Sequence, residues 1–154
     1  MKLFAWGDDL NVDIALIDRQ HREYVRRTNA FLEASMNRQT RGPASANNTF
    51  RFLRKYIDEH FTTEEELMAE TSYSEEGKHV AQHRHFQGEV DRFGDAVTSG
   101  ELSTDSLLRL NYLLVDWFQR HIKQVDKRLS QHLTEKARAS GNGKLRDFLK
   151  GIFD

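Results

Sequence analysis

Four long segments in which apolar residues recur at the spacing of an α-helix constrain the fold of this chain more than any other feature of its sequence. Helix-breaking stretches separate them, namely residues 37–48, which hold the only proline, 70–78, 98–106 and 140–143. The periodic segments themselves cover residues 17–38, 48–70, 76–97 and 105–133. Helices that are apolar on one face bury that face against each other, and short loops join antiparallel neighbours. The sequence therefore predicts an all-α fold, an up-down-up-down antiparallel four-helix bundle with an N-terminal arm.

Composition is that of a one-domain protein with balanced charge. Its 154 residues, of which 38% are hydrophobic, suffice for one proper core. The 23 basic and 24 acidic residues are mixed along the chain, so we expect neither nucleic acid nor a membrane as a partner. The absence of cysteine excludes disulfides, thiolate catalysis and zinc fingers, and it fits a cytoplasmic location. The N-terminus becomes acidic at Asp8 and has no sustained apolar run, which argues against a signal peptide or a membrane span.

Polar residues interrupt the apolar stripes at positions that should face the bundle core. They are five of the seven histidines and two carboxylates: His21, His60, Glu64, His79, His83, His121 and Asp126. A single inward histidine is more often a hydrogen-bonded core residue than a metal ligand, and an inward histidine and glutamate could form a structural ion pair. These explanations weaken because the inward histidines are distributed over all four helices, and because a buried, unpaired carboxylate costs several kcal/mol. We expect the other two histidines, His85 and His132, at the surface or edge.

The spacing and chemistry of these residues favour a metal site. His60 and Glu64 are four residues apart, as are His79 and His83, so each pair projects from one helix face about 6 Å apart along the axis. Imidazole and carboxylate without sulfur suit iron, zinc, copper or manganese. Ferritin-like bundles use more carboxylates and a Glu-x-x-His spacing, so that alternative is disfavoured.

The number of ligands indicates two metal ions. Seven side chains exceed the roughly six positions of one octahedral ion. Two such ions with five histidines, two bridging carboxylates and one bridging oxygen keep one position open. A site of this kind binds one small exogenous ligand.

His121 and Asp126 lie five residues apart, a spacing that a straight helix does not favour for two side chains on one face. At about 100° per residue, the two point about 140° apart. Upstream of His121 the stripe runs through Leu114 and Trp117, and downstream of it the same pattern is displaced by about one residue. One inserted residue would bring both ligands onto a common face, so we predict a π-bulge near residues 121 to 126.

In these motifs the chain resembles the bacterial hemerythrins. The resemblance covers about residues 6 to 130 and runs through Trp6, "IDRQH", "HFTTEEELM", Tyr73, "HVAQH" and "WFQRHIKQVDKRL". The chain departs from the family at Ser74, where a proline is common, and at Asp13, where a glycine often precedes the first helix. Both departures concern loop geometry and leave the ligand positions intact.

The resemblance implies an O2-binding centre of two iron ions joined by an oxo or hydroxo bridge. The ligands that it implies are His79, His83 and His121 for one iron, His21 and His60 for the second, and Glu64 and Asp126 as bridges. The open position on the second iron would bind O2 reversibly, for storage, delivery or sensing. That reaction needs no protein acid or base. A histidine-rich, carboxylate-poor ligand set offers less anionic donation to a high-valent iron, which favours a binding protein over an enzyme. A di-iron oxidase, peroxidase or nitric-oxide-handling enzyme with the same ligands is the alternative.

Residues near the ligands in sequence are candidates for supporting them. Metal-bound imidazoles are usually oriented by a second hydrogen bond. Four acidic residues are candidates for that role: Asp18, Glu59, Glu65 and Asp116. We expect the large inward residues Ile17, Phe61 and Trp117 to be plain core.

Residues 134–154 form a predicted C-terminal extension beyond a bundle of residues 1–133. Apolar side chains recur at helix spacing over 144–153, which predicts a short amphipathic helix with Leu145, Phe148, Leu149, Ile152 and Phe153 on one side. We expect it to pack on the bundle's own surface. A contact with a protein partner or a second copy is the alternative, and a membrane contact is least favoured.

Overall fold

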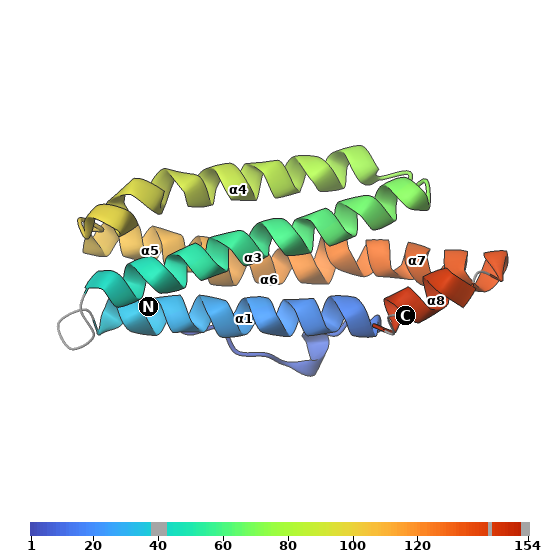
Figure 1. Ribbon diagram of the computed structural model, residues 1–154, viewed down its shortest axis with the longest axis horizontal. Helices are drawn as coiled ribbons and strands as arrows, with labels where there is room; N and C mark the ends of the chain where they lie inside the picture. Colours follow the sequence, from blue (N-terminus) through green and yellow to red (C-terminus); the bar gives the residue numbers. More distant parts are fainter. Residues whose placement is uncertain (38–42, 142, 152–154) are drawn as a thin grey trace.

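A four-helix bundle forms the body of the protein, as seen in a computed structural model that describes residues 1–37, 43–141 and 143–151 (Figure 1). The first three helices are α1 (Ala15–Met36), α3 (Pro43–Glu70) and α4 (Glu76–Ser99). The fourth is continuous and consists of α5 (Thr104–Tyr112), the π turn η2 (Leu113–Trp117), α6 (Phe118–His121), the π turn η3 (Ile122–Asp126) and α7 (Lys127–Ser140). Within the described ranges there is no strand, and the predicted all-α bundle is confirmed.

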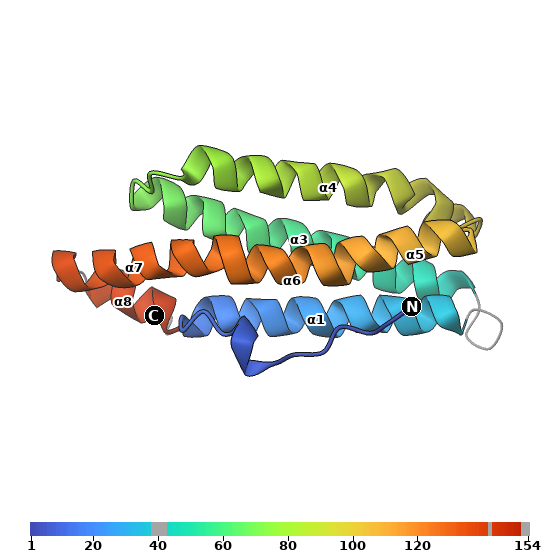
Figure 2. The ribbon, with the colours of Figure 1, turned by 180° about the vertical axis from the view of Figure 1, so that it is seen from behind.

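Neighbouring helices along the chain are neighbours in space. α1 packs against α3, α3 against α4, and α4 against α5 and η2. Figures 1 and 2 show the resulting antiparallel arrangement from opposite sides. The buried side chains between the helices form one apolar core, whose largest members are Tyr24, Phe31, Phe61, Phe86 and Phe118. None of the helices in the described part of the chain is both long and apolar enough to span a bilayer.

The second helix begins earlier than its apolar stripe suggested. Its predicted start at residue 48 is wrong, because α3 begins at Pro43. Proline is well suited to the first helical position, where its missing N–H would have no partner in the helix and its φ is already helical. Residues 43–48, read from the sequence as part of a helix-breaking stretch, therefore belong to the helix.

The fourth helix extends beyond the predicted end of the bundle. α7 continues without a break past residue 133 to Ser140 and ends at Gly141, which has a left-handed φ of 59°. Glycine adopts this conformation without the steric cost that other residues meet, so it is the usual residue after a helix. The division of the chain at residue 133 stays a prediction, and the boundary lies inside α7.

The N-terminal arm lies along the outside of α1 and contains one short helix, η1 (Asp8–Leu10) (Figure 2). Reciprocal hydrogen bonds tie the arm to α1: Phe4 N donates to Asn29 Oδ1 at 2.7 Å, and Asn29 Nδ2 donates to Phe4 O at 2.9 Å. Asp18 accepts the backbone N–H groups of Val12 and Asp13, at 2.8 and 3.2 Å. These bonds fix the entry into α1, where Asp13 has a left-handed φ of 66°.

The C-terminal segment forms α8 (Gly143–Leu149), which lies against α1 and α7. Leu149 is buried in this contact and Leu145 packs partly against the core. The predicted packing on the bundle's own surface is therefore confirmed for Leu145 and Leu149, whereas Phe148, predicted on the same side, is exposed. Ile152 and Phe153 lie outside the described residues.

Candidate metal centre

The predicted π-bulge is present in the fourth helix. η3 covers Ile122–Asp126, and at its end the N–H of Lys127 donates to the carbonyl of Ile122, five residues back. As a result, His121 and Asp126 both point into the core, and His121 Nε2 lies 3.0 Å from Asp126 Oδ1. The unfavourable spacing in the sequence is thus resolved by one extra residue in the helix.

A second π turn, η2, was not predicted from the sequence. It changes which residues face the core just before the predicted ligands His121 and Asp126, because Phe118 is fully buried while Trp117 is only half-buried. The regular i to i+4 hydrogen bonding is interrupted there, and Tyr24 Oη donates to the carbonyl of Leu114 at 2.7 Å. The hydroxyl on α1 therefore supports the irregular turn in the fourth helix.

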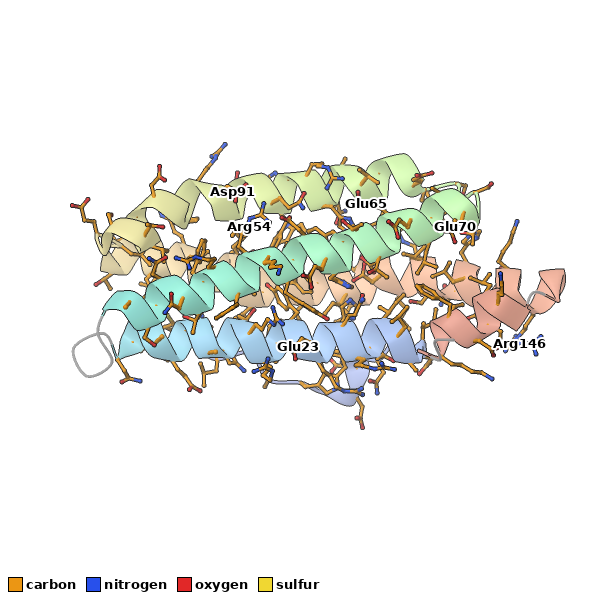
Figure 3. All side chains as sticks on the ribbon, in the orientation of Figure 1. Glu23, Arg54, Glu65, Glu70, Asp91 and Arg146 are labelled. Carbon is orange, nitrogen blue, oxygen red and sulfur yellow. The ribbon has the colours of Figure 1, made fainter. Side chains whose placement is uncertain are left out.

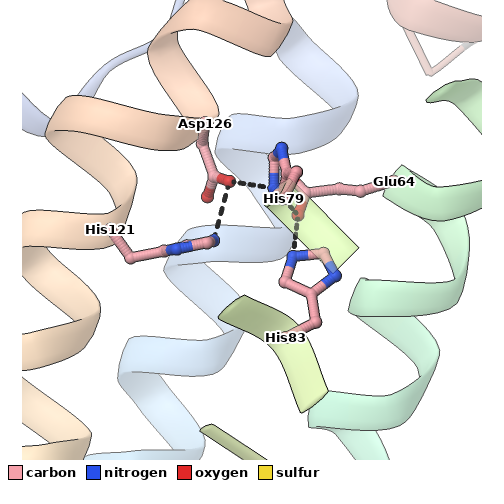
Figure 4. A group of neighbouring side chains, drawn as sticks. All are labelled: Glu64, His79, His83, His121 and Asp126. Atoms are coloured by element: carbon pink, nitrogen blue, oxygen red, sulfur yellow. Dashed lines mark ion pairs between the residues drawn. The ribbon is translucent and has the colours of Figure 1, made fainter. Parts of the chain in front are cut away.

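All seven predicted ligand residues lie together in the middle of the bundle, and all are buried. They form two groups that share Glu64 and Asp126. The first group also holds His79, His83 and His121, and the second also holds His21 and His60. Within each group the ligand atoms lie within 4.8 Å of one another. Figure 4 shows the first group, with the three imidazoles gathered around the two carboxylates.

Every imidazole of the cluster presents its Nε2 atom to a carboxylate. The shortest distances to Asp126 are 2.9 Å from His21, 3.0 Å from His121 and 3.1 Å from His79. Those to Glu64 are 3.2 Å from His83 and 3.6 Å from His60. His79 Nε2 also lies 3.7 Å from Glu64 Oε1. The two carboxylates therefore stand between the two groups of histidines, where bridging ligands would stand.

Hydrogen bonding gives a test of whether this donor set fits a metal. Nε2 of all five histidines and both oxygens of Glu64 and Asp126 are buried, and although they lie close to one another, none of them makes a hydrogen bond in the described structure. Buried polar atoms are nearly always hydrogen-bonded, so such a concentration of unpaired atoms requires another partner. Imidazole nitrogens and carboxylate oxygens aimed at common points are what a transition-metal ion binds, so the residues fit.

Burial and mutual charge set the protonation of the cluster. Burial opposes ionisation of Asp126, but the neighbouring histidines overcome it and hold the pKa of Asp126 well below its usual range. Burial lowers the pKa of His60 to about 4, so this imidazole is neutral, as a metal ligand must be. Burial also disfavours the charged form of His79, yet contacts with Asp126 and Glu64 raise its pKa to about 10. A metal ion would take the place of that proton.

Three histidines have an oxygen acceptor on the side away from the carboxylates. His60 Nδ1 lies 2.7 Å from Gln20 Oε1, and His121 Nδ1 lies 2.9 Å from Gln82 Oε1. The third contact joins His83 Nδ1 to a carboxylate, Glu65 Oε2, at 2.8 Å. When Nδ1 carries the proton and donates to such an oxygen, Nε2 keeps its lone pair for a metal.

Of the four acidic candidates for this supporting role, Glu65 contacts a ligand histidine. The other three have different partners: Asp18 holds the arm, Asp116 pairs with Lys2 at 2.6 Å, and Glu59 lies 4.0 Å from Lys55. Sequence reasoning missed Gln20 and Gln82. Their sequence signal is adjacency alone, because each of the three supporting residues directly precedes or follows a predicted ligand, whereas the histidine that each one contacts lies on another helix.

Aromatic rings surround the imidazoles. Phe61 stacks on His83 with ring centroids 3.8 Å apart and planes 3° from parallel. Phe118 stacks on Tyr24 at 3.6 Å and meets the ring of His21 edge-on at 6.2 Å. The expectation that Phe61 is a core residue is confirmed, since it is buried, and its ring also packs flat against the predicted ligand His83.

One side of the cluster approaches the surface. A hollow of about 490 Å³ between α4 and the fourth helix is lined by Gln82, Trp117, Arg120 and His121, among others. Exposed His85 also lines it, and His132 lies at the edge of the core with Nε2 3.0 Å from Thr71 Oγ1. The predicted surface or edge positions of these two histidines are confirmed.

Comparisons with known proteins agree with this geometry. The family model described as "Hemerythrin HHE cation binding domain" matches residues 12–133. A bacteriohemerythrin of Stenotrophomonas maltophilia (strain R551-3) is 31% identical over 147 residues, which cover 93% of this chain and 92% of the relative. A bacteriohemerythrin of Pseudomonas paraeruginosa (strain DSM 24068 / PA7) is 30% identical over 126 residues, or 82% of this chain and 78% of the relative. The crystal structure of a wild-type hemerythrin superposes with a TM-score of 0.71 at 22% identity, covering 84% of this chain and 97% of that one, which shows the shared fold.

Proposed function

Because the chain belongs to the hemerythrin family, we propose that it binds O2 reversibly at a centre of two iron ions in the middle of the bundle. The observation that carries this proposal is the cluster of unpaired, buried donor atoms on five histidines and two carboxylates. In the proposal, the three-histidine group holds one iron and the two-histidine group holds the other, with Glu64 and Asp126 shared between them. The family match supports iron over the other metals that this donor set could bind.

The residues around the cluster suit a ligand that binds and leaves unchanged. Two iron(II) ions would supply the electrons and the open coordination position that reversible O2 binding requires. The chain provides five neutral-type donors and only two anionic ligands, a set that stabilises high oxidation states less than a carboxylate-rich one does. Phe61 and Phe118 place apolar rings beside the imidazoles and exclude water from them.

The two groups differ in the number of histidines, and that difference supports an assignment of the open position. Three imidazoles and two carboxylates fill more of a six-coordinate shell than two imidazoles and the same carboxylates. We therefore assign the O2-binding position to the side of His21 and His60. Storage, delivery and sensing are all compatible with this site, and a cytoplasmic location stays a prediction from the sequence.

Repeated oxygenation tests the proposal. The iron-loaded protein is reduced without air, O2 is admitted, and the visible charge-transfer band is followed through successive cycles of O2 removal and return. A band that disappears and returns supports reversible binding. Irreversible oxidation in the first cycle, or sustained turnover with a reductant or peroxide, would establish an enzyme and refute the proposal.

A pair of histidine variants gives the matched control. His21→Ala removes a ligand from the two-histidine group, and His132→Ala removes a histidine that lies at the core edge and contacts Thr71. We expect the first to lose the band and most of one iron per chain, and the second to keep both. Equal loss in the two variants would show that the band does not depend on the proposed ligands.

A further inference from the structure

The three oxygen acceptors behind the ligand histidines differ in charge. Gln20 and Gln82 offer neutral amide oxygens to His60 and His121, whereas Glu65 offers a carboxylate oxygen to His83. The three contacts are equally close, between 2.7 and 2.9 Å. The chemical nature of the acceptor is therefore what distinguishes His83 from the other two supported histidines.

Glu65 is held so that each of its oxygens has a separate partner. Oε2 faces His83 at 2.8 Å, and Oε1 accepts a hydrogen bond from the guanidinium of Arg84. The Glu65 side chain is only 19% exposed while that of Arg84 is 55% exposed, so the arginine covers the carboxylate from the solvent side. Figure 3 shows Glu65 between α3 and α4, the two helices that this contact joins. Arg84 also donates to Gln87 Oε1 at 2.7 Å, which restrains the guanidinium itself.

The ring of His83 is fixed from two directions. Glu65 sets its rotation through Nδ1, and Phe61 stacks against its face. A carboxylate that accepts a hydrogen bond from Nδ1–H makes the imidazole a stronger donor at Nε2 than a neutral amide does, because a hydrogen bond to an ionised acceptor is about twice as strong. A stronger donor stabilises a ferric ion more than a ferrous one, because the ferric ion has the greater charge.

We propose that Glu65 is a positioning residue that makes His83 the strongest imidazole donor of the centre. By doing so, Glu65 lowers the reduction potential of the metal centre and tightens metal retention in the three-histidine group. The inference rests on the metal centre of the proposed function but does not depend on whether that centre binds O2. Arg84 is part of the device, because it keeps the carboxylate of Glu65 aimed at His83.

Glu65→Gln tests the proposal with nearly unchanged shape. In the zinc-loaded protein, the proton NMR signal of His83 Nδ1–H should move upfield in this variant, since the hydrogen bond to an amide is weaker. Metal retention against a chelator should fall about 10- to 100-fold, as for other outer hydrogen bonds of metal ligands. In the iron-loaded protein the midpoint potential should rise. Arg84→Gln keeps the carboxylate group but removes the contact that aims it at His83, so it should shift all three quantities in the same direction but less.

Two further variants separate this role from plain stabilisation. Gln82→Glu gives His121 the anionic acceptor that His83 already has, and it should lower the midpoint potential. Arg54→Gln removes a surface pair with Asp91, at 2.6 Å on the same two helices but away from the ligands, and it should leave the potential and the NMR signal unchanged. Figure 3 shows this pair and Glu65 on one face of the bundle.

The outcomes distinguish this inference from the proposed function. If Glu65→Gln changes the His83 signal and the midpoint potential no more than Arg54→Gln does, Glu65 is a structural residue and the inference is wrong. This conclusion holds whether or not the protein binds O2 reversibly. If the zinc-loaded protein shows the shifted signal but iron-loaded protein does not bind O2 reversibly, the proposed function is wrong and the role of Glu65 stands.

Discussion

Deleting one residue from the η3 turn should preserve both the bundle and the metal site. We choose Gln124, which is exposed and lies between His121 and Asp126. Its removal reduces the spacing of the two ligands from five residues to four, so a regular helix turns them to within about 40° of each other. Because the π turn is lost together with the residue, the part of the helix that follows keeps its orientation. The regular hydrogen bonding that returns is worth about 0.5–1.5 kcal/mol, so we expect the free energy of unfolding to change by no more than that.

The same deletion in the regular helix just beyond η3 should be far more harmful. Arg128 is also exposed, but deleting it forces one of two losses. Either the following helix rotates by about 100° and turns Leu129 and Leu133 out of the core, or the π turn is consumed and Asp126 rotates away from the site. Both leucines are fully buried, so the first alternative costs about 3–6 kcal/mol at about 1.5–3 kcal/mol per side chain. The second preserves stability but removes a ligand.

Two assays applied to both deletions check this reasoning. Urea unfolding of the metal-free proteins measures the free energy of unfolding, and zinc titration measures the number of ions bound per chain. We expect the Gln124 deletion to match the parent in both and the Arg128 deletion to fail in at least one. If the Gln124 deletion loses metal binding, or is destabilised as much as the other, then η3 does not serve to set the register of the ligands.

Three more predictions concern buried groups and backbone strain. Tyr24→Phe should lower the free energy of unfolding by about 1–2 kcal/mol in urea unfolding, because the carbonyl of Leu114 loses its hydroxyl donor. The metal-free protein should be most stable near pH 6.5, measured by urea unfolding across pH. The pKa of His79 is raised from 6.5 to about 10, so the stability that this residue contributes below pH 6.5 is lost as the pH rises toward 10. The pKa of His60 is lowered to about 4, so this residue reduces the stability as the pH falls from 6.5 toward 4. Asp13 has a left-handed φ of 66°, so Asp13→Gly should not lower the melting temperature while Asp13→Val should cost about 1–2 kcal/mol.

The sequence predicted the parts of this structure that depend on one helix at a time. Inward polar residues stand out against an apolar stripe, so the seven residues of the cluster could be named together, although their role as iron ligands stays a prediction. The start of α3 was misplaced because a proline can either end a periodic segment or open a helix. The supporting roles of Gln20 and Gln82 were missed because each amide directly precedes a predicted ligand of its own helix but contacts a histidine of another helix. Which helices face each other, and at what height, is a property of the packing.

The second π turn is a different case, because the burial pattern along the fourth helix accounts for it. Side chains that are at most 1% exposed recur every four residues along the fourth helix, at Leu110, Leu114, Phe118, Ile122, Asp126 and Ser130. Four residues turn a regular helix by about 400°, which exceeds a full turn by about 40°, so five such steps would carry the buried face about 200° around the helix. Each inserted residue removes about 100° of that rotation, and two are needed to keep the face on the core. The structure has two, in η2 and η3. The period of four residues therefore requires both irregular turns, and the spacing of His121 and Asp126 reveals only the one that lies between them.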